Sequence, residues 1–76
     1  MAATKTPHIP NPPVNGEAVR RRRVQLGLTQ DQLATQARIE RVTIVQIETG
    51  VRTNPREATV TAIANALGVP RESLLS

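Results

Sequence analysis

Three glycine residues divide this chain into short segments, and they limit its possible folds more than any other feature. Gly27, Gly50 and Gly68 each follow a stretch without the alternating apolar pattern of a strand. Glycine adopts the left-handed conformation with which helices commonly end, so each position predicts a helix C-terminus. We therefore expect an all-α fold built from short helices.

Polar residues indicate where the first three helices begin. Asn15 can cap a helix that runs to about Leu26, and Thr29 followed by Gln32 is a capping-box pattern that opens a second helix. A third segment covers about residues 40–49 and carries two isoleucines at helical spacing.

A fourth helix is predicted from its cap and from its apolar period. Asn54, Pro55 and Glu57 fit the cap, the first-turn proline and the reciprocal carboxylate of its first turn. Its apolar residues recur at helical spacing and are Val60, Ile63, Ala64 and Leu67. Pro70 can open a fifth helix. The expected architecture is a compact five-helix domain over residues 15–76.

Residues 1–14 differ in composition from the rest of the chain. They hold four of the six prolines and show no hydrophobic period. We expect a flexible, Pro-rich N-terminal tail. The alternative is an arm that becomes ordered on contact with DNA or protein.

Composition favours DNA as a partner and excludes several kinds of site. Ten Lys or Arg against six Asp or Glu give a net charge of +4, which favours a polyanion. Phe, Trp and Tyr are absent, so the stacking surfaces of single-strand binders are missing. Cysteine is also absent, and His8 alone cannot complete a metal site. Neither a cofactor nor enzymatic activity is expected, since no nucleophile and base can be assembled.

The second and third helices meet across a tight corner, because only Arg38 and Ile39 separate them. Such a pair is a helix-turn-helix, and its second helix lies in the major groove. The residues that carry the motif are 23–34, Ile39, Thr43, Ile44, 47–50 and 63–69. In these residues the chain resembles the Cro/repressor-type (XRE, lambda-repressor-like) family. The resemblance covers residues 16–75 and implies a DNA-binding regulator, cytoplasmic and nucleoid-associated, of bacterial or phage type.

Two residues depart from the family pattern. Arg38 stands where the family commonly has glycine, and a left-handed arginine costs about 1 kcal/mol. Glu40 stands where serine or threonine usually caps the third helix. Its carboxylate suits the helix dipole but lies near phosphates, so it either accepts a hydrogen bond from cytosine or weakens binding.

The third helix is predicted to have two faces. Its isoleucines pack inward, which leaves Arg41 and Gln46 outward with groups suited to guanine and adenine. Val42 and Val45 share this outward face and can meet thymine methyl groups. The resemblance places base contacts at the same four positions. The alternative is that all four side chains are only solvated.

Four further residues are expected to contact phosphates without distinguishing sequence. Thr29 and Gln30 lie at the N-terminus of the second helix, where free backbone N–H groups point outward. Arg52 and Thr53 follow the third helix. The alternative is that Gln30 only extends the cap and that Arg52 is a free surface charge.

Arg23 is predicted to have a structural role. It lies one turn after Val19 on the buried side of the first helix and therefore needs a charged partner. Glu48 on the third helix is the natural carboxylate, and the resemblance implies the same pair. Arg20, Arg21 and Arg22 are expected to be solvated; the alternative is that one of them touches a phosphate.

These features predict a sequence-specific, double-stranded-DNA-binding transcriptional regulator, expected to be a repressor. Useful affinity for so small a module requires two copies, so we expect a homodimer on a palindromic operator. Residues 70–76 are the expected self-contact, because Leu75 has no evident inward role. One alternative is an antitoxin-like or phage-type regulator that also binds a protein partner through its tail. Another is a protein-interaction module that has kept the fold but lost DNA binding. The negative charge of Glu40 near the expected phosphates is the feature that supports this alternative.

Overall fold

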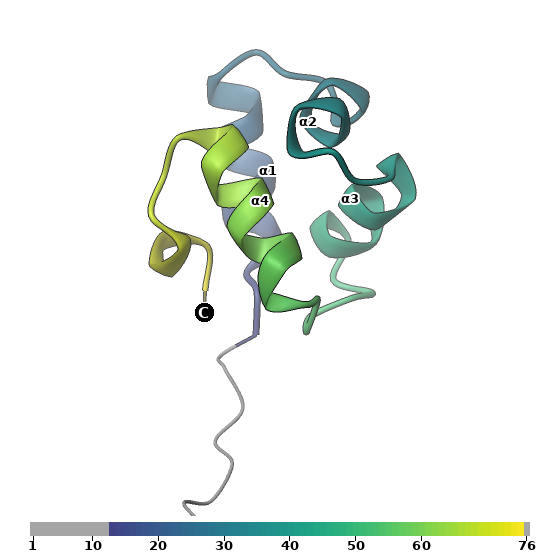
Figure 1. The fold of residues 1–76 in the computed structure, drawn as a ribbon, viewed down its shortest axis with the longest axis vertical. Helices are drawn as coiled ribbons and strands as arrows, with labels where there is room; N and C mark the ends of the chain where they lie inside the picture. The colour runs from purple at the N-terminus through teal and green to yellow at the C-terminus, as the bar shows by residue number, and fades with distance from the viewer. Residues whose placement is uncertain (1–12, 76) are drawn as a thin grey trace, which may run out of the picture.

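A computed structural model describes residues 13–75, and all its regular elements are helical (Figure 1). The α-helices are α1 (Gly16–Gln25), α2 (Gln30–Ala37), α3 (Arg41–Glu48) and α4 (Glu57–Leu67), followed by a single 3-10 turn, η1 (Arg71–Leu74). The all-α prediction is confirmed. The expected fifth helix is this one 3-10 turn, in which the Ser73 N–H and hydroxyl both donate to the Pro70 carbonyl.

The first two predicted caps are present. The Asn15 side chain accepts hydrogen bonds from the backbone N–H groups of Glu17 and Ala18, which starts α1. Thr29 and Gln32 form both halves of the capping box at the start of α2. Each cap satisfies N–H groups that have no partner inside the helix, so both helices begin where the sequence predicts.

The predicted start of α4 is wrong. Asn54 does not cap the helix, which begins at Glu57 with Arg56 in the cap position and no side-chain cap bond. Arg56 has a ψ of 149°, so the chain is still extended two residues after Asn54. Glu57 instead forms an ion pair with Arg71 of η1, at 2.8 Å from its Nη1 to the carboxylate.

Left-handed residues end the segments as expected. Gly27, Gly50 and Gly68 have φ values of 72°, 82° and 67°. Arg38 is the only other residue with positive φ in residues 13–75, at φ 58° and ψ 44°. The corner between α2 and α3 is thus built on a left-handed arginine, the strained case that the sequence analysis considered for Arg38.

The helices pack around one apolar core. α2 packs on both α3 and α4, and α1 packs on α3. The buried residues are Val14, Val19, Leu33, Ala34, Ala37, Ile44, Ile47, Val60, Ile63, Ala64, Leu67 and Leu74. Leu26, at the predicted end of the first helix, is 42% exposed because it lies beyond the last turn of α1. None of the helices in residues 13–75 combines the length and apolarity needed to span a membrane.

Val14 joins the beginning of the described chain to its end. It is buried and forms an antiparallel bridge with Leu75, while the Asn15 N–H donates to the Leu74 carbonyl. Leu75 packs partly against the core, contrary to the expectation that it has no inward role. The folded part therefore starts at least one residue before the expected boundary at Asn15. The rest of the predicted tail, residues 1–12, lies outside the described residues.

Candidate nucleic-acid interface

Helix α3 has one buried face and one exposed face. Ile44 and Ile47 are 0% and 1% exposed, whereas Val42 is 53% exposed. Arg41 is exposed, and Val45 and Gln46 are half-buried. The predicted inward packing of the isoleucines is confirmed. The four expected base-contacting residues all retain accessible surface on the other side.

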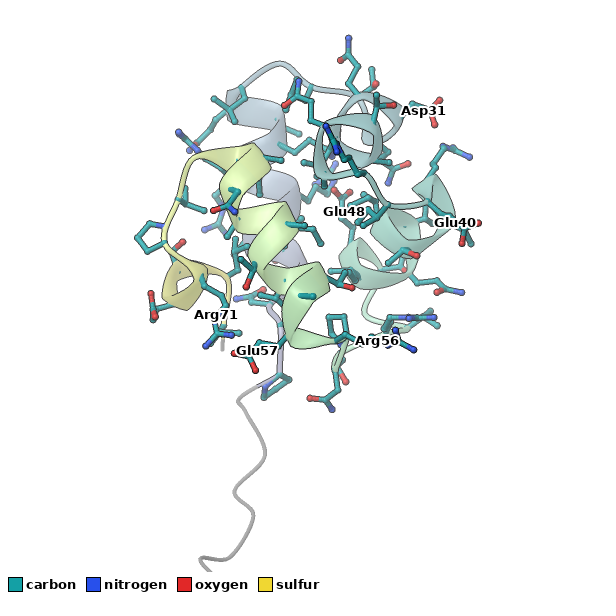
Figure 2. All side chains as sticks on the ribbon, viewed as in Figure 1. Asp31, Glu40, Glu48, Arg56, Glu57 and Arg71 are labelled. Carbon is teal, nitrogen blue, oxygen red and sulfur yellow. The ribbon has the colours of Figure 1, made fainter. Side chains whose placement is uncertain are left out.

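The corner before α3 fixes its angle to α2. The Ile39 N–H donates to the Ala34 carbonyl and the Arg38 N–H donates to the Thr35 carbonyl, so the backbone turns sharply after α2. Ile39 packs partly against the core. Glu40 occupies the cap position of α3, is exposed and makes no side-chain cap bond. Figure 2 shows its side chain on the outer side of the molecule, beside the start of α3.

A buried carboxylate joins α1, α2 and α3. Arg23 donates from Nε to Oε2 of Glu48 at 2.7 Å and from Nη2 to Oε1 at 3.0 Å. Its Nη1 donates to the Leu28 carbonyl at 2.8 Å. The two side chains are only 12% and 2% exposed, so the predicted pair is present and largely removed from water. These hydrogen bonds to Glu48 raise the pKa of Arg23 above its ordinary value.

Gln30 takes part in the same network. Its Nε2 donates to Oε1 of Glu48 at 3.1 Å, so the first residue of α2 is tied to the last residue of α3. The sequence predicted Gln30 as a phosphate contact. Its amide carries a second hydrogen and an acceptor oxygen, so the bond to Glu48 leaves that prediction open.

The loop after α3 carries the other predicted phosphate contacts. The Arg52 N–H donates to the Gln46 carbonyl at 2.9 Å, and the Thr53 carbonyl accepts from the Val14 N–H at 2.9 Å. These backbone bonds fix the loop, and the side chains of both residues are exposed. Arg52 and Thr53 therefore lie on an ordered surface next to the C-terminus of α3.

Sequence reasoning missed two charged residues beside this face. Arg56 is exposed at the end of the loop that also carries Arg52, and Figure 2 shows its position just before α4. Asp31 of α2 forms an ion pair with Arg41, at 3.3 Å from its Oδ1 to Nε. The sequence could have indicated Arg56, because it is the second arginine, after Arg52, between the third and fourth helices. Only the docking of α2 on α3 reveals the role of Asp31, because it lies ten positions before its partner in the sequence.

Arg22 also differs from its expected role. It is half-buried, and its Nε donates to the Leu67 carbonyl at the C-terminus of α4 at 3.1 Å. Arg20 and Arg21 are exposed as predicted. In residues 13–75 no group of three or more His, Cys, Asp or Glu residues is placed to hold a metal ion.

Comparisons with known proteins also identify a helix-turn-helix in this chain. A family model described as Helix-turn-helix matches residues 19–74. The HTH-type transcriptional repressor RghR of Bacillus subtilis (strain 168) is 40% identical over 60 residues, which are 79% of this chain and 44% of that protein. The chain therefore spans less than half the length of this curated relative.

Two solved DNA complexes contain domains of the same fold. The P22 c2 repressor, bound to a synthetic operator, is 31% identical with a TM-score of 0.74, over 80% of this chain and 91% of that one. SinR of Bacillus subtilis, bound to DNA, is 25% identical with a TM-score of 0.76, over 79% of this chain and 98% of that one. The described fold is thus lambda-repressor-like.

Proposed function

The chain belongs to the helix-turn-helix family of the Cro/repressor type, and from this premise we propose that it is a transcriptional regulator that recognises specific sequences in double-stranded DNA. The curated relative is a transcriptional repressor, which supports repression as the outcome of binding. A repressor of this kind acts by occupying DNA, so it needs neither a catalytic group nor a cofactor.

The observation that carries the proposal is the two-faced α3. Ile44 and Ile47 anchor it in the core, while Arg41 and Val42 stay exposed at its N-terminal end. A helix held in this way is about as wide as the major groove and can present four side chains to base edges. We assign base contacts to Arg41, Val42, Val45 and Gln46.

Phosphate contacts are assigned to residues on either side of α3. Thr29 and Gln30 lie at the N-terminus of α2, where backbone N–H groups are directed outward. Arg52 and Thr53 belong to the loop that follows α3, and Arg56 adds a further positive charge there. Contacts of this kind fix the orientation of the domain and do not distinguish sequences.

We further propose that two copies bind as a homodimer to half-sites about 34 Å apart, because a single module of this size buries limited surface on DNA. We also propose that the protein acts in the cytoplasm, at the nucleoid, because that is where its DNA target would lie. A regulator that also binds a protein partner through the Pro-rich tail, residues 1–14, is the second candidate. The part of RghR that this chain does not match shows that relatives carry further sequence beyond this domain.

The test is selection of bound duplexes from a random DNA pool, followed by anisotropy titrations at several salt concentrations. We expect an enriched palindromic sequence and an affinity that falls about a thousand-fold between about 50 and 200 mM salt if six or more phosphates are bound. A pool that yields no enriched sequence, or an affinity insensitive to salt, contradicts the proposal.

A further inference from the structure

An ion pair connects the two helices of the helix-turn-helix on its outer side. Asp31 is the second residue of α2 and Arg41 is the first residue of α3, and the carboxylate Oδ1 lies 3.3 Å from the guanidinium Nε. Figure 2 shows Asp31 and Glu40 on the same outer side of α2 and α3. In residues 13–75 Arg41 has no other ion pair, and Glu40 has none.

This ion pair is poorly suited to stabilise the fold. The side chains of Arg41 and Asp31 are 61% and 76% exposed, so water and salt screen their attraction. The buried pair of Arg23 and Glu48 already fixes α3 relative to α1. The contact with Asp31 therefore matters for a different reason. It keeps the guanidinium of Arg41 in one orientation beside the start of α2.

The atoms involved leave the recognition edge of Arg41 free. The ion pair is formed with Nε, and neither Nη1 nor Nη2 donates a hydrogen bond within residues 13–75, so both remain available as a fork. Two parallel N–H groups match the O6 and N7 acceptors of guanine in the major groove. An arginine held by one edge loses less rotational freedom when its other edge binds a base.

The carboxylate also makes incorrect binding costly. On a duplex that lacks this guanine, the long, exposed side chain of Arg41 can change its conformation and contact a phosphate instead. That movement separates it from Asp31 and leaves an unpaired negative charge next to the DNA backbone. Repulsion of this kind penalises non-cognate sequences, and such penalties are a common source of specificity.

We propose that Asp31 is a specificity-determining residue, which orients Arg41 toward guanine without itself contacting a base. The inference rests on the proposed function and adds to it a named residue outside α3. It also names the ligand feature involved, the O6 and N7 edge of one guanine in each half-site.

The test compares Asp31→Asn with the native chain on the selected duplex and on the duplexes that replace each base pair in turn. Arg41→Ala first identifies the base pair at which discrimination depends on Arg41. At that pair we expect Asp31→Asn to reduce the preference for guanine about threefold to tenfold, with little change in melting temperature. Asp31→Glu keeps the charge and should restore part of the preference. In the Arg41→Ala background, Asp31→Asn should leave discrimination unchanged.

Glu57→Gln is the matched control. Glu57 is also an exposed first-turn acid in an ion pair with an arginine, here the half-buried Arg71, and Figure 2 shows both away from α3. Both substitutions remove one negative charge, so a general electrostatic effect strengthens binding to every duplex in both variants.

The inference is overturned if Asp31→Asn keeps full discrimination, or only tightens binding to all duplexes equally. It also fails if Arg41→Ala alters discrimination at no base pair. A pool without an enriched sequence defeats the proposed function instead, so the two failures are distinguishable.

Discussion

Arg23 and Glu48 meet in a two-point ion pair, with Nε to Oε2 at 2.7 Å and Nη2 to Oε1 at 3.0 Å. Both charges are largely withdrawn from water, and each has a further hydrogen-bond partner, Leu28 for the arginine and Gln30 for the carboxylate. Two buried charges of this kind are tolerated only together, because either one alone lacks compensation for its lost hydration.

Removal of one partner should therefore be costly. We expect Arg23→Ala or Glu48→Ala to lower the free energy of unfolding by about 3–5 kcal/mol, as measured by urea denaturation. Glu17→Gln breaks the exposed pair with Arg21, at 3.7 Å, and should change stability far less. Equal losses in the buried and exposed variants would contradict a special role for the buried pair.

Gly16 should resist substitution although it lies in a helix. A Cβ at this position would collide with the backbone carbonyl of Ile47 and lie 3.1 Å from the Glu48 Cα. Alanine is usually preferred over glycine in a helix by about 1 kcal/mol, so in open space Gly16→Ala would stabilise the protein. We expect destabilisation by about 1–3 kcal/mol instead, because the end of α3 must shift. A calorimetric melting temperature above that of the native chain would refute the close contact.

Arg38 should tolerate glycine with a gain in stability. Its left-handed backbone costs a non-glycine residue about 1–2 kcal/mol, partly offset by the greater entropy that glycine loses on folding. Arg38→Gly should thus raise the melting temperature by about 3–6 °C. Arg38→Ala removes the same charge but keeps the strain, so it should give no such rise. If both variants melt alike, the left-handed strain is not the cause.

Arg41 and Arg52 should differ in how their loss affects DNA binding. Arg41→Ala should cost about 1–3 kcal/mol on the selected duplex and relax preference at one base pair. Arg52→Ala should weaken binding to all duplexes alike and reduce the salt slope by about one. Anisotropy titrations on cognate and random duplexes distinguish the two, and equal losses for Arg41→Ala on both would remove it from the base contacts.

The sequence predicted the parts of the fold that depend on local chemistry. The capping box at Thr29 and the left-handed glycines are contained within a few residues, so their pattern is visible without tertiary information. The pairing of Arg23 with Glu48 was accessible because a charge on a buried helix face requires a partner.

Other contacts between distant segments could not be predicted from the sequence. The bridge from Val14 to Leu75 joins single residues at the two ends of the described chain, with no strand pattern to reveal it. Arg22 lies in a run of four arginines, and only the position of the Leu67 carbonyl distinguishes it from its exposed neighbours. The start of α4 shifted because an extended Arg56 replaced the expected cap at Asn54.

The carboxylate of Glu48, at the end of α3, binds side chains from both α1 and α2. The distance between the start of α2 and the end of α3 is therefore fixed. A bound duplex would then have to adapt its curvature and groove width to the fixed arrangement of α2 and α3. Base steps that bend or compress easily should be favoured even where no side chain reaches them, since the stiffness of DNA varies with its sequence.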